Sequence, residues 1–261
     1  ATTAEYPLSV ERRLVADVPL GVFLSGGVDS SIVAAIMARH SAQPIPAFTI
    51  GFREKAYDER QRAALVARHL GAAHTVRILE PGDILAAVDE VLDYFDEPFG
   101  DSSALPTFFV AQMAREQVKA VLTGDGAAEL FGGYAKYLGP YYARRFRALP
   151  RPVQALLRRG LAAIPHAAAS DAFLRQAKKV AATAGLDHFS LHYGLMCLGF
   201  DDASRQALLR PGLFRETGPF VRAHYDALPG DDPMAKGFYT DLKIVLEGDM
   251  LTKVDRMSMY H

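Results

Sequence analysis

The chain has 261 residues, of which 50% are hydrophobic and 23% are charged, so it can build a sizeable core and is not a disordered protein. Lysine and arginine number 29 against 30 aspartate and glutamate residues, a formal net charge of −1. This balance argues against a nucleic-acid coat protein and against binding to an anionic membrane surface. The single cysteine, Cys197, excludes a disulfide framework and a cysteine-rich zinc site, and it favours a reducing, cytoplasmic location.

The first half of the chain alternates segments typical of β-strands with segments typical of amphipathic helices. Strands are predicted at 18–24, 47–52, 74–79 and 120–123, and helices at 28–39, 58–70, 82–94 and 105–117. The first two helices are expected to face inward through Ile32, Val33, Ile36, Met37, Leu65, Val66 and Leu70. Gly71 is a typical stop after the second helix.

This alternation predicts an α/β fold in which a parallel sheet is flanked by helices. Right-handed crossovers place helices on both faces of such a sheet, and ligands bind beyond the carboxyl ends of its strands. Two polar, glycine-containing segments follow predicted strands directly, at 25–31 and at 123–134. These two segments are therefore the candidate functional sites.

The second half of the chain has a different pattern, because strand-like segments disappear after about residue 140. Helices are predicted at 151–161, 172–184, 188–198 and 219–228. We therefore expect an α/β core over 1–139 and a mostly helical extension over 140–261. No stretch approaches the roughly 18 apolar residues that a membrane span requires.

The segment from Ser25 to Ser31 reads Ser-Gly-Gly-Val-Asp-Ser-Ser and lies between a predicted buried strand and a predicted helix. Gly26 and Gly27 allow the backbone to approach an anion closely. The free N–H groups at the start of a helix point at negative charge, and the helix dipole favours it. The hydroxyls of Ser25, Ser30 and Ser31 add further donors. This segment therefore predicts a phosphate-binding loop.

Other features of the sequence narrow the kind of phosphate site. No Gly-Lys-Ser or Gly-Lys-Thr occurs, which excludes the loop that typically holds β- and γ-phosphates, and no G-x-G-x-x-G follows a strand. Asp29 would repel a phosphate unless a cation lies between them. The carboxylate of Asp29 therefore predicts Mg²⁺ at this loop.

The Ser-Gly-Gly-x-Asp-Ser-Ser segment resembles the pyrophosphate loop of the N-type (PP-loop) ATP pyrophosphatases, whose α/β core is of the Rossmann-like HUP kind. Members of that superfamily cleave ATP between its α- and β-phosphates. Further blocks are similar to the synthetase domain of class B, glutamine-hydrolysing asparagine synthetases. They lie at 17–24, 57–59, 66–71 with His74, 96–99, 101–107, 123–126, 129–134 and 248–259.

The resemblance implies that ATP and Mg²⁺ activate a carboxylate, typically the side chain of aspartate, as an acyl-adenylate with release of pyrophosphate. Ammonia from a glutaminase domain then attacks, and AMP leaves. By resemblance, Leu24 and Ile50 flank the adenine, Thr123 and Gly124 lie near the nucleotide, the loop from Ser25 to Ser31 holds pyrophosphate and Asp29 binds Mg²⁺. Asp125 is the candidate for managing the amine's proton and Lys253 for stabilising the phosphates.

Three departures from that family pattern stand out. Ala127 and Ala128 stand where the family usually has Gly-Asp or Ser-Asp, and Ala128 cannot replace the expected carboxylate ligand of a second Mg²⁺, although Asp125 or Glu129 could compensate. The family's N-terminal glutaminase domain is absent, and the chain stops at His261 inside a familiar block. We therefore expect a fragment or excised domain, in which Cys197 has a structural role.

Several alternatives stay open. A degenerate nucleotide-binding domain would explain Ala128, and a β-lactam-forming or peptide-cyclising relative would change the acceptor carboxylate. A tRNA-modifying enzyme is the third alternative, because arginines cluster between residues 144 and 159, but a solvated helical face explains them more simply. His188 and His192 have the spacing of zinc ligands without an evident third ligand. A homodimer is compatible with the resemblance.

Overall fold

The computed structural model describes residues 2–55, 57–164, 174, 177–178, 181, 185–196, 200 and 202–261. Its contacts divide the chain into two compact units. The first unit comprises Ala1–Ala127 together with Glu247–His261, and the second comprises Ala128–Leu246. These units differ from the predicted division at 139 and 140, because the last segment of the chain returns to the unit that holds the sheet. The assignment of 1–139 and 140–261 as domains stays a prediction.

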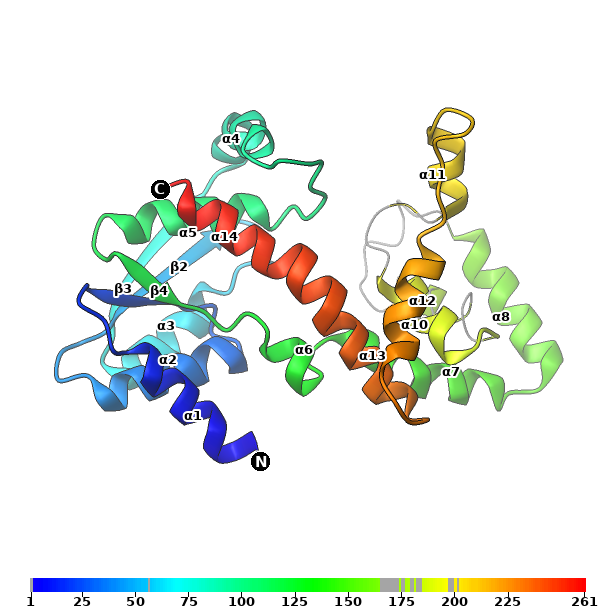
Figure 1. The fold of residues 1–261 in the computed structure, drawn as a ribbon, viewed down its shortest axis with the longest axis horizontal. Helices are drawn as coiled ribbons and strands as arrows, with labels where there is room; N and C mark the ends of the chain where they lie inside the picture. Colours follow the sequence, from blue (N-terminus) through cyan, green and yellow to red (C-terminus); the bar gives the residue numbers. More distant parts are fainter. Residues whose placement is uncertain are drawn as a thin grey trace. The chain divides into compact units, whose positions relative to one another are not determined.

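The first unit contains a four-stranded sheet, as the alternating pattern predicted (Figure 1). Its strands are β1 (Leu20–Phe23), β2 (Pro46–Phe52), β3 (Ala73–Leu79) and β4 (Ala120–Leu122). They lie in the order β3-β2-β1-β4, and every neighbouring pair is parallel. In register, Val22 lies beside Ala47 on one side and Leu122 on the other. All four strands therefore end at the same edge, where the candidate loops begin.

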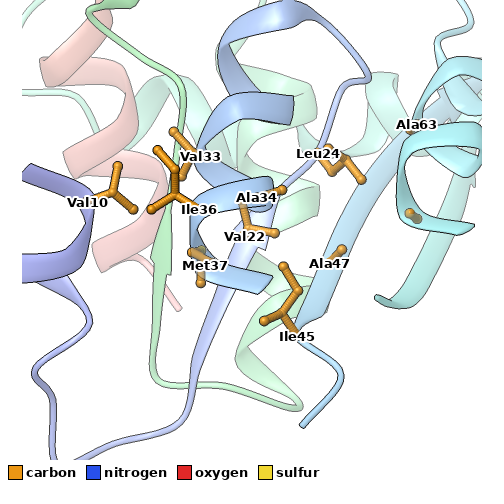
Figure 2. Packing of buried hydrophobic residues seen from close by; sticks show 11 residues of the cluster. Val10, Val22, Leu24, Val33, Ala34, Ile36, Met37, Ile45, Ala47 and Ala63 are labelled. Carbon is orange, nitrogen blue, oxygen red and sulfur yellow. The ribbon is translucent and has the colours of Figure 1, made fainter. Parts of the chain in front are cut away.

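Helices cover both faces of this sheet (Figure 1). One face packs against α1 (Thr2–Arg13), α2 (Val28–His40) and α3 (Arg60–Leu70). Figure 2 shows this cluster, in which Val10 of α1 and Ile36 of α2 pack near Val22 of the central strand β1. The opposite face is covered by α4 (Pro81–Asp93), α5 (Ala104–Arg115) and α14 (Thr252–Met259).

The sequence predicted the inward residues of α2 and α3 only in part. Ile32 and Leu65 were expected to face inward and are instead 42% and 65% exposed. In α3 the fully buried residues are Ala63 and Ala67, because the helix approaches the strands closely enough that only small side chains fit there. Gly71 does end α3, with φ +64° and its N–H donated to the carbonyl of Ala67.

In its described residues the second unit contains helices and no strand, as the sequence predicted. Its helices are α7 (Gly139–Arg147), α8 (Arg151–Ala163), α10 (His188–Met196), α11 (Asp202–Leu208), α12 (Gly218–Ala227) and α13 (Pro233–Asp241). A 3₁₀ turn, η1 (Ala135–Leu138), precedes α7, while α6 (Ala127–Phe131) and η3 (Leu242–Leu251) link the two units in sequence. Most of the helix predicted at 172–184, and Cys197, lie outside the described residues.

The arginine cluster of the second unit lies on exposed helical surface, as the simpler explanation predicted. Arg144, Arg145, Arg147, Arg151, Arg158 and Arg159 are all exposed on α7 and α8. In the described part of the chain, no helix combines the length and the apolar character needed to cross a membrane.

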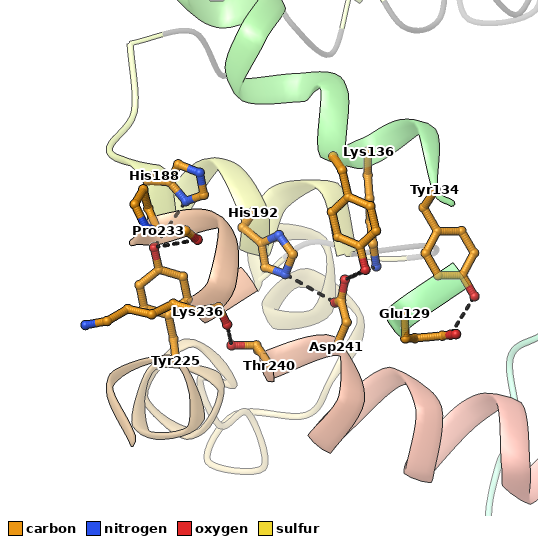
Figure 3. A network of polar contacts seen from close by, with 11 residues as sticks. Glu129, Tyr134, Lys136, His188, His192, Tyr225, Pro233, Lys236, Thr240 and Asp241 are labelled. Atoms are coloured by element: carbon orange, nitrogen blue, oxygen red, sulfur yellow. Dashed lines mark hydrogen bonds and ion pairs between the residues drawn. The ribbon is translucent and has the colours of Figure 1, made fainter. Parts of the chain in front are cut away.

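A buried polar network holds the second unit together (Figure 3). The fully buried carboxylate of Asp241 accepts hydrogen bonds from Tyr137 Oη at 2.6 Å and from His192 Nε2 at 3.2 Å, and it pairs with Lys136 Nζ at 2.9 Å. Burial alone would raise the pKa of Asp241, but the hydrogen bond and charge of His192, the charge of Lys136 and the Tyr137 hydroxyl outweigh it, so its pKa is lowered.

Candidate functional site

The loop that follows β1 has the backbone of an anion cradle. Gly26 has φ +76°, and a Cβ at this position would lie 2.4 Å from the backbone nitrogen of Ala63. Only glycine therefore fits there. Helix α2 begins at Val28 with Gly27 as its N-cap, and no side chain caps it. An uncapped helix start leaves N–H donors and the positive end of the helix dipole for a ligand.

The serine hydroxyls of this loop are organised by one another. Ser25 Oγ lies 2.9 Å from Ser30 Oγ and accepts the N–H of Gly27 at 3.2 Å. The N–H of Ser25 donates to Ser30 Oγ at 3.2 Å. Ser31 Oγ is buried and has no hydrogen-bond partner among the described residues. A buried hydroxyl without a partner is costly unless a ligand satisfies it, so the loop fits phosphate oxygens.

The loop that follows β4 contacts the loop that follows β1. A Cβ on Gly124 would lie 2.8 Å from the backbone nitrogen of Ser30 and 3.1 Å from Cβ of Asp29. The neighbouring Asp125 is exposed, and its N–H donates to Thr123 Oγ1 at 3.3 Å. Because β1 and β4 are parallel neighbours, their carboxyl ends bring together the two segments that the sequence singled out.

Leu24 is the first residue after β1, and Ile50 lies within the neighbouring strand β2, two residues before its end. Leu24 is only 1% exposed and packs in the core beside α2 and α3, while the half-buried Ile50 packs on the opposite face of the sheet. Both side chains pack into the hydrophobic clusters on the two faces of the sheet. Their role beside an adenine stays a prediction.

Two polar residues near this edge were missed by the sequence analysis. Thr49 lies inside an otherwise apolar, buried strand, and that contrast was the signal that could have identified it. The side chain of Arg60 covers Gly51, where a Cβ would lie 2.1 Å from Arg60 Cδ. Asp58 holds the guanidinium through contacts of 2.7 Å and 2.8 Å.

Lys253 is buried at 6% exposure and meets a distant segment of the chain. Its Nζ donates to Asp101 Oδ2 at 3.0 Å and to Ser103 Oγ at 2.7 Å, at the start of α5. Burial opposes ionisation of Asp101, but hydrogen bonds from Ser103 and the charge of Lys253 outweigh it and lower its pKa. In the described part of the chain, the remaining hydrogen bond of Lys253 goes to the sulfur of Met250.

The carboxylate of Asp29 fits Mg²⁺ of the kind that binds together with phosphates. Within the described residues, no group of three or more His, Cys, Asp or Glu side chains could hold a metal by itself. Mg²⁺ commonly uses one or two carboxylates plus substrate phosphates and waters, so a single carboxylate at a phosphate loop suits it.

The other residues weighed as ligands have partners in the second unit. Glu129 is fully buried, and its Oε1 accepts the hydroxyl of Tyr134 at 2.6 Å (Figure 3). His188 Nδ1 lies 3.1 Å from the hydroxyl of Tyr225, while His192 belongs to the Asp241 network. One ring nitrogen of each histidine is thus engaged, and among the described residues no group of three or more ligands includes them.

Comparison with known proteins identifies the family to which this chain is similar. The family model described as asparagine synthase matches residues 8–261. The chain is 36% identical over 259 residues to a putative glutamine-hydrolyzing asparagine synthetase of Mycobacterium tuberculosis, covering 98% of this chain and 38% of the relative. It is 28% identical over 255 residues to asparagine synthetase [glutamine-hydrolyzing] 1 of Bacillus subtilis, covering 96% of this chain and 38% of the relative.

A shorter match concerns a putative asparagine synthetase of Methanocaldococcus jannaschii. It is 40% identical over 144 residues, which cover 55% of this chain and 28% of the relative. The chain thus spans 38% of the length of the first two relatives.

Proposed function

Because the chain belongs to the asparagine synthase family, we propose that it is the ATP-binding, amide-forming part of a glutamine-dependent asparagine synthetase. In the proposed reaction, the side-chain carboxylate of aspartate attacks the α-phosphorus of ATP and displaces pyrophosphate. Ammonia released from glutamine by a glutaminase domain then attacks the acyl carbon, loses a proton and displaces AMP, giving asparagine.

The observation that carries this proposal is the meeting of two loops at the carboxyl edge of the sheet. The uncapped start of α2, the hydroxyls of Ser25 and Ser30 and the unpartnered hydroxyl of Ser31 suit the pyrophosphate part of ATP. Gly124 lies against Ser30, which allows the nucleotide to contact both loops. Such preorganised donors would stabilise the negative charge that develops on the departing pyrophosphate.

Individual residues take distinct roles in the proposal. Asp29 would hold Mg²⁺, which would neutralise charge on the departing pyrophosphate. Asp125 is exposed beside the nucleotide loop and would accept the proton of the incoming ammonia. Lys253 would place a compact cation near the phosphates, and Asp101 and Ser103 orient its ammonium group.

Ala128 favours one alternative, a domain that binds ATP without turning it over. Its methyl side chain has no oxygen to offer a metal, whereas the family resemblance leads one to expect a carboxylate at this position. A relative that activates another carboxylate, in β-lactam formation or peptide cyclisation, would keep the same phosphate site. A cytoplasmic location and a homodimer are further parts of the proposal.

ATP–pyrophosphate exchange tests the proposal on the full-length protein with Mg²⁺, with and without aspartate. Exchange that depends on aspartate is the expected result, and Ala128→Asp measured in parallel shows how much the missing carboxylate matters. Exchange only in that variant would indicate an intact phosphate loop with a deficient metal site. ATP binding without exchange in either protein would favour the non-catalytic alternative, and a screen of other carboxylates would then identify a different acceptor.

A further inference from the structure

A chain of hydrogen bonds crosses the sheet and ends at the phosphate loop. Thr49 on β2 is 3% exposed, and its Oγ1 lies 2.6 Å from the carbonyl oxygen of Leu24 and 2.7 Å from Nε2 of His74 on β3. Strand β1 ends at Phe23, so Leu24 is the first residue beyond the strand. The Thr49 side chain therefore holds the backbone at the point where the loop begins.

The chemistry of these groups determines which one donates in each of these hydrogen bonds. A carbonyl oxygen only accepts, so the single hydroxyl hydrogen of Thr49 is donated to Leu24. Thr49 Oγ1 must then accept from His74, which places a hydrogen on Nε2 of that ring. Burial lowers the pKa of His74, which favours the neutral imidazole, and neutral imidazole with hydrogen on Nε2 is sufficient for this donation.

The effect continues through the next peptide group into the loop itself. The carbonyl of Leu24 and the N–H of Ser25 belong to one planar peptide unit, so fixing the first orients the second. That N–H donates to Ser30 Oγ at 3.2 Å. Ser30 Oγ accepts this hydrogen and keeps its own, which it can donate to Ser25 Oγ at 2.9 Å, to the carbonyl oxygen of Gly27 at 3.4 Å or to a ligand.

We propose that Thr49 and His74 are positioning residues of the phosphate loop, which orient the Leu24–Ser25 peptide and, through it, the hydroxyl of Ser30. This inference rests on the proposed function, since the ligand in question is the phosphate part of ATP. Neither side chain touches the ligand. They act by keeping the loop in the geometry that binds it, so that no reorganisation is needed on binding.

The test uses a matched pair of substitutions in the full-length protein. Thr49→Val keeps the shape of the side chain but leaves the Leu24 carbonyl without its donor, whereas Thr49→Ser restores the hydroxyl. Thr75→Val is the control. It removes a hydroxyl from the neighbouring strand β3, and this hydroxyl accepts a hydrogen bond from Gln117 and does not contact the loop. The readouts are the dissociation constant of ATP with Mg²⁺, from calorimetry at a temperature far below unfolding, and the melting temperature without ligand.

Thr49→Val is expected to weaken ATP binding about tenfold, which corresponds to about 1.4 kcal/mol. Thr49→Ser and Thr75→Val should stay within about twofold of the parent protein. A second pair of substitutions repeats the comparison at His74, the first donor of this hydrogen-bond series. His74→Phe should weaken ATP binding as Thr49→Val does. His74→Gln, whose side-chain amide can donate to Thr49, should restore the binding.

The outcomes separate the two ideas. If the parent protein binds ATP and Thr49→Val and His74→Phe bind it equally well, the positioning role is wrong while the proposed function stands. A loss of melting temperature without a change in ATP affinity would likewise overturn it, because it indicates a purely structural contact. If the parent protein binds no ATP, the proposed function fails and the inference fails with it. Should Thr49→Val not fold, the His74 pair decides.

Discussion

The substitution Asp241→Asn tests how the second unit is stabilised. Asp241 has no exposed surface, and its carboxylate accepts from Tyr137 at 2.6 Å while pairing with Lys136 at 2.9 Å. Asparagine keeps the size of the side chain but removes the charge. The ammonium of Lys136, only 15% exposed, would lose its counter-charge, and His192 would lose a charged acceptor.

The magnitude follows from burial. Removing one partner of a buried ion pair typically costs about 3–5 kcal/mol, because the other charge stays desolvated. Lys136 keeps slight solvent contact, so we expect about 3 kcal/mol, at the lower end of that range. For a unit of this size such a loss corresponds to a fall in melting temperature of about 10 °C.

The assay is thermal and urea unfolding of the full-length protein, with amide hydrogen exchange in α10 and α13 to assign the loss to the second unit. Asp226→Asn is the matched control, because Asp226 pairs with Arg222 at 2.7 Å while both side chains are 50% exposed. An exposed pair of this kind contributes below about 0.5 kcal/mol. Equal losses in the two variants would refute the argument from burial.

Three further predictions concern the first unit and the response to acid. Gly26→Ala forces φ +76° on a residue with a Cβ and places that Cβ 2.4 Å from Ala63, so ATP binding should be lost and melting lowered. Calorimetry and a melting curve check this, and tight ATP binding by the variant would contradict it. Lys253→Met leaves the carboxylate of Asp101 without its cation, which should cost about 1–3 kcal/mol and reduce pyrophosphate exchange; unchanged stability and exchange would contradict it. Burial lowers the pKa values of His74, His188 and His261 below those in the unfolded chain. The unfolded state therefore binds more protons near pH 6, and the free energy of unfolding falls as the pH drops below about 6.5. Urea unfolding at pH 7.5 and 5.5 measures this, and equal or greater stability at pH 5.5 would contradict it.

The sheet and its two loops could be predicted because their signals are local. Each of the first three strands is a short, mainly apolar segment followed by a helix with its own periodicity, and this alternation is sufficient to predict parallel pairing. The loop from Ser25 to Ser31 carries its residue types in consecutive positions, so it too can be identified without knowledge of distant contacts.

The features that sequence reasoning missed depend on distant contacts. Helix α1 (Thr2–Arg13) is polar on average and contains Pro7, and Val10 packing into the core is what holds it. Asp241 meets His192 and Tyr137 across 49 and 104 residues of chain. From the sequence, His192 was considered as a metal ligand because its hydrogen-bond partner, Asp241, is far away in the sequence.

In the proposed function, binding and turnover of ATP would rest on different groups of this chain, which makes them separable. The donors of the phosphate loop are backbone N–H groups and serine hydroxyls, fixed by Gly26, by Gly124 and by the hydrogen bonds around Ser30. None of these donors requires a carboxylate at position 128. The metal, in contrast, depends on carboxylate oxygens, and Ala128 supplies none. Ala128→Asp should therefore change the Mg²⁺ dependence of pyrophosphate exchange more than the affinity for ATP, whereas loop substitutions should act on affinity first.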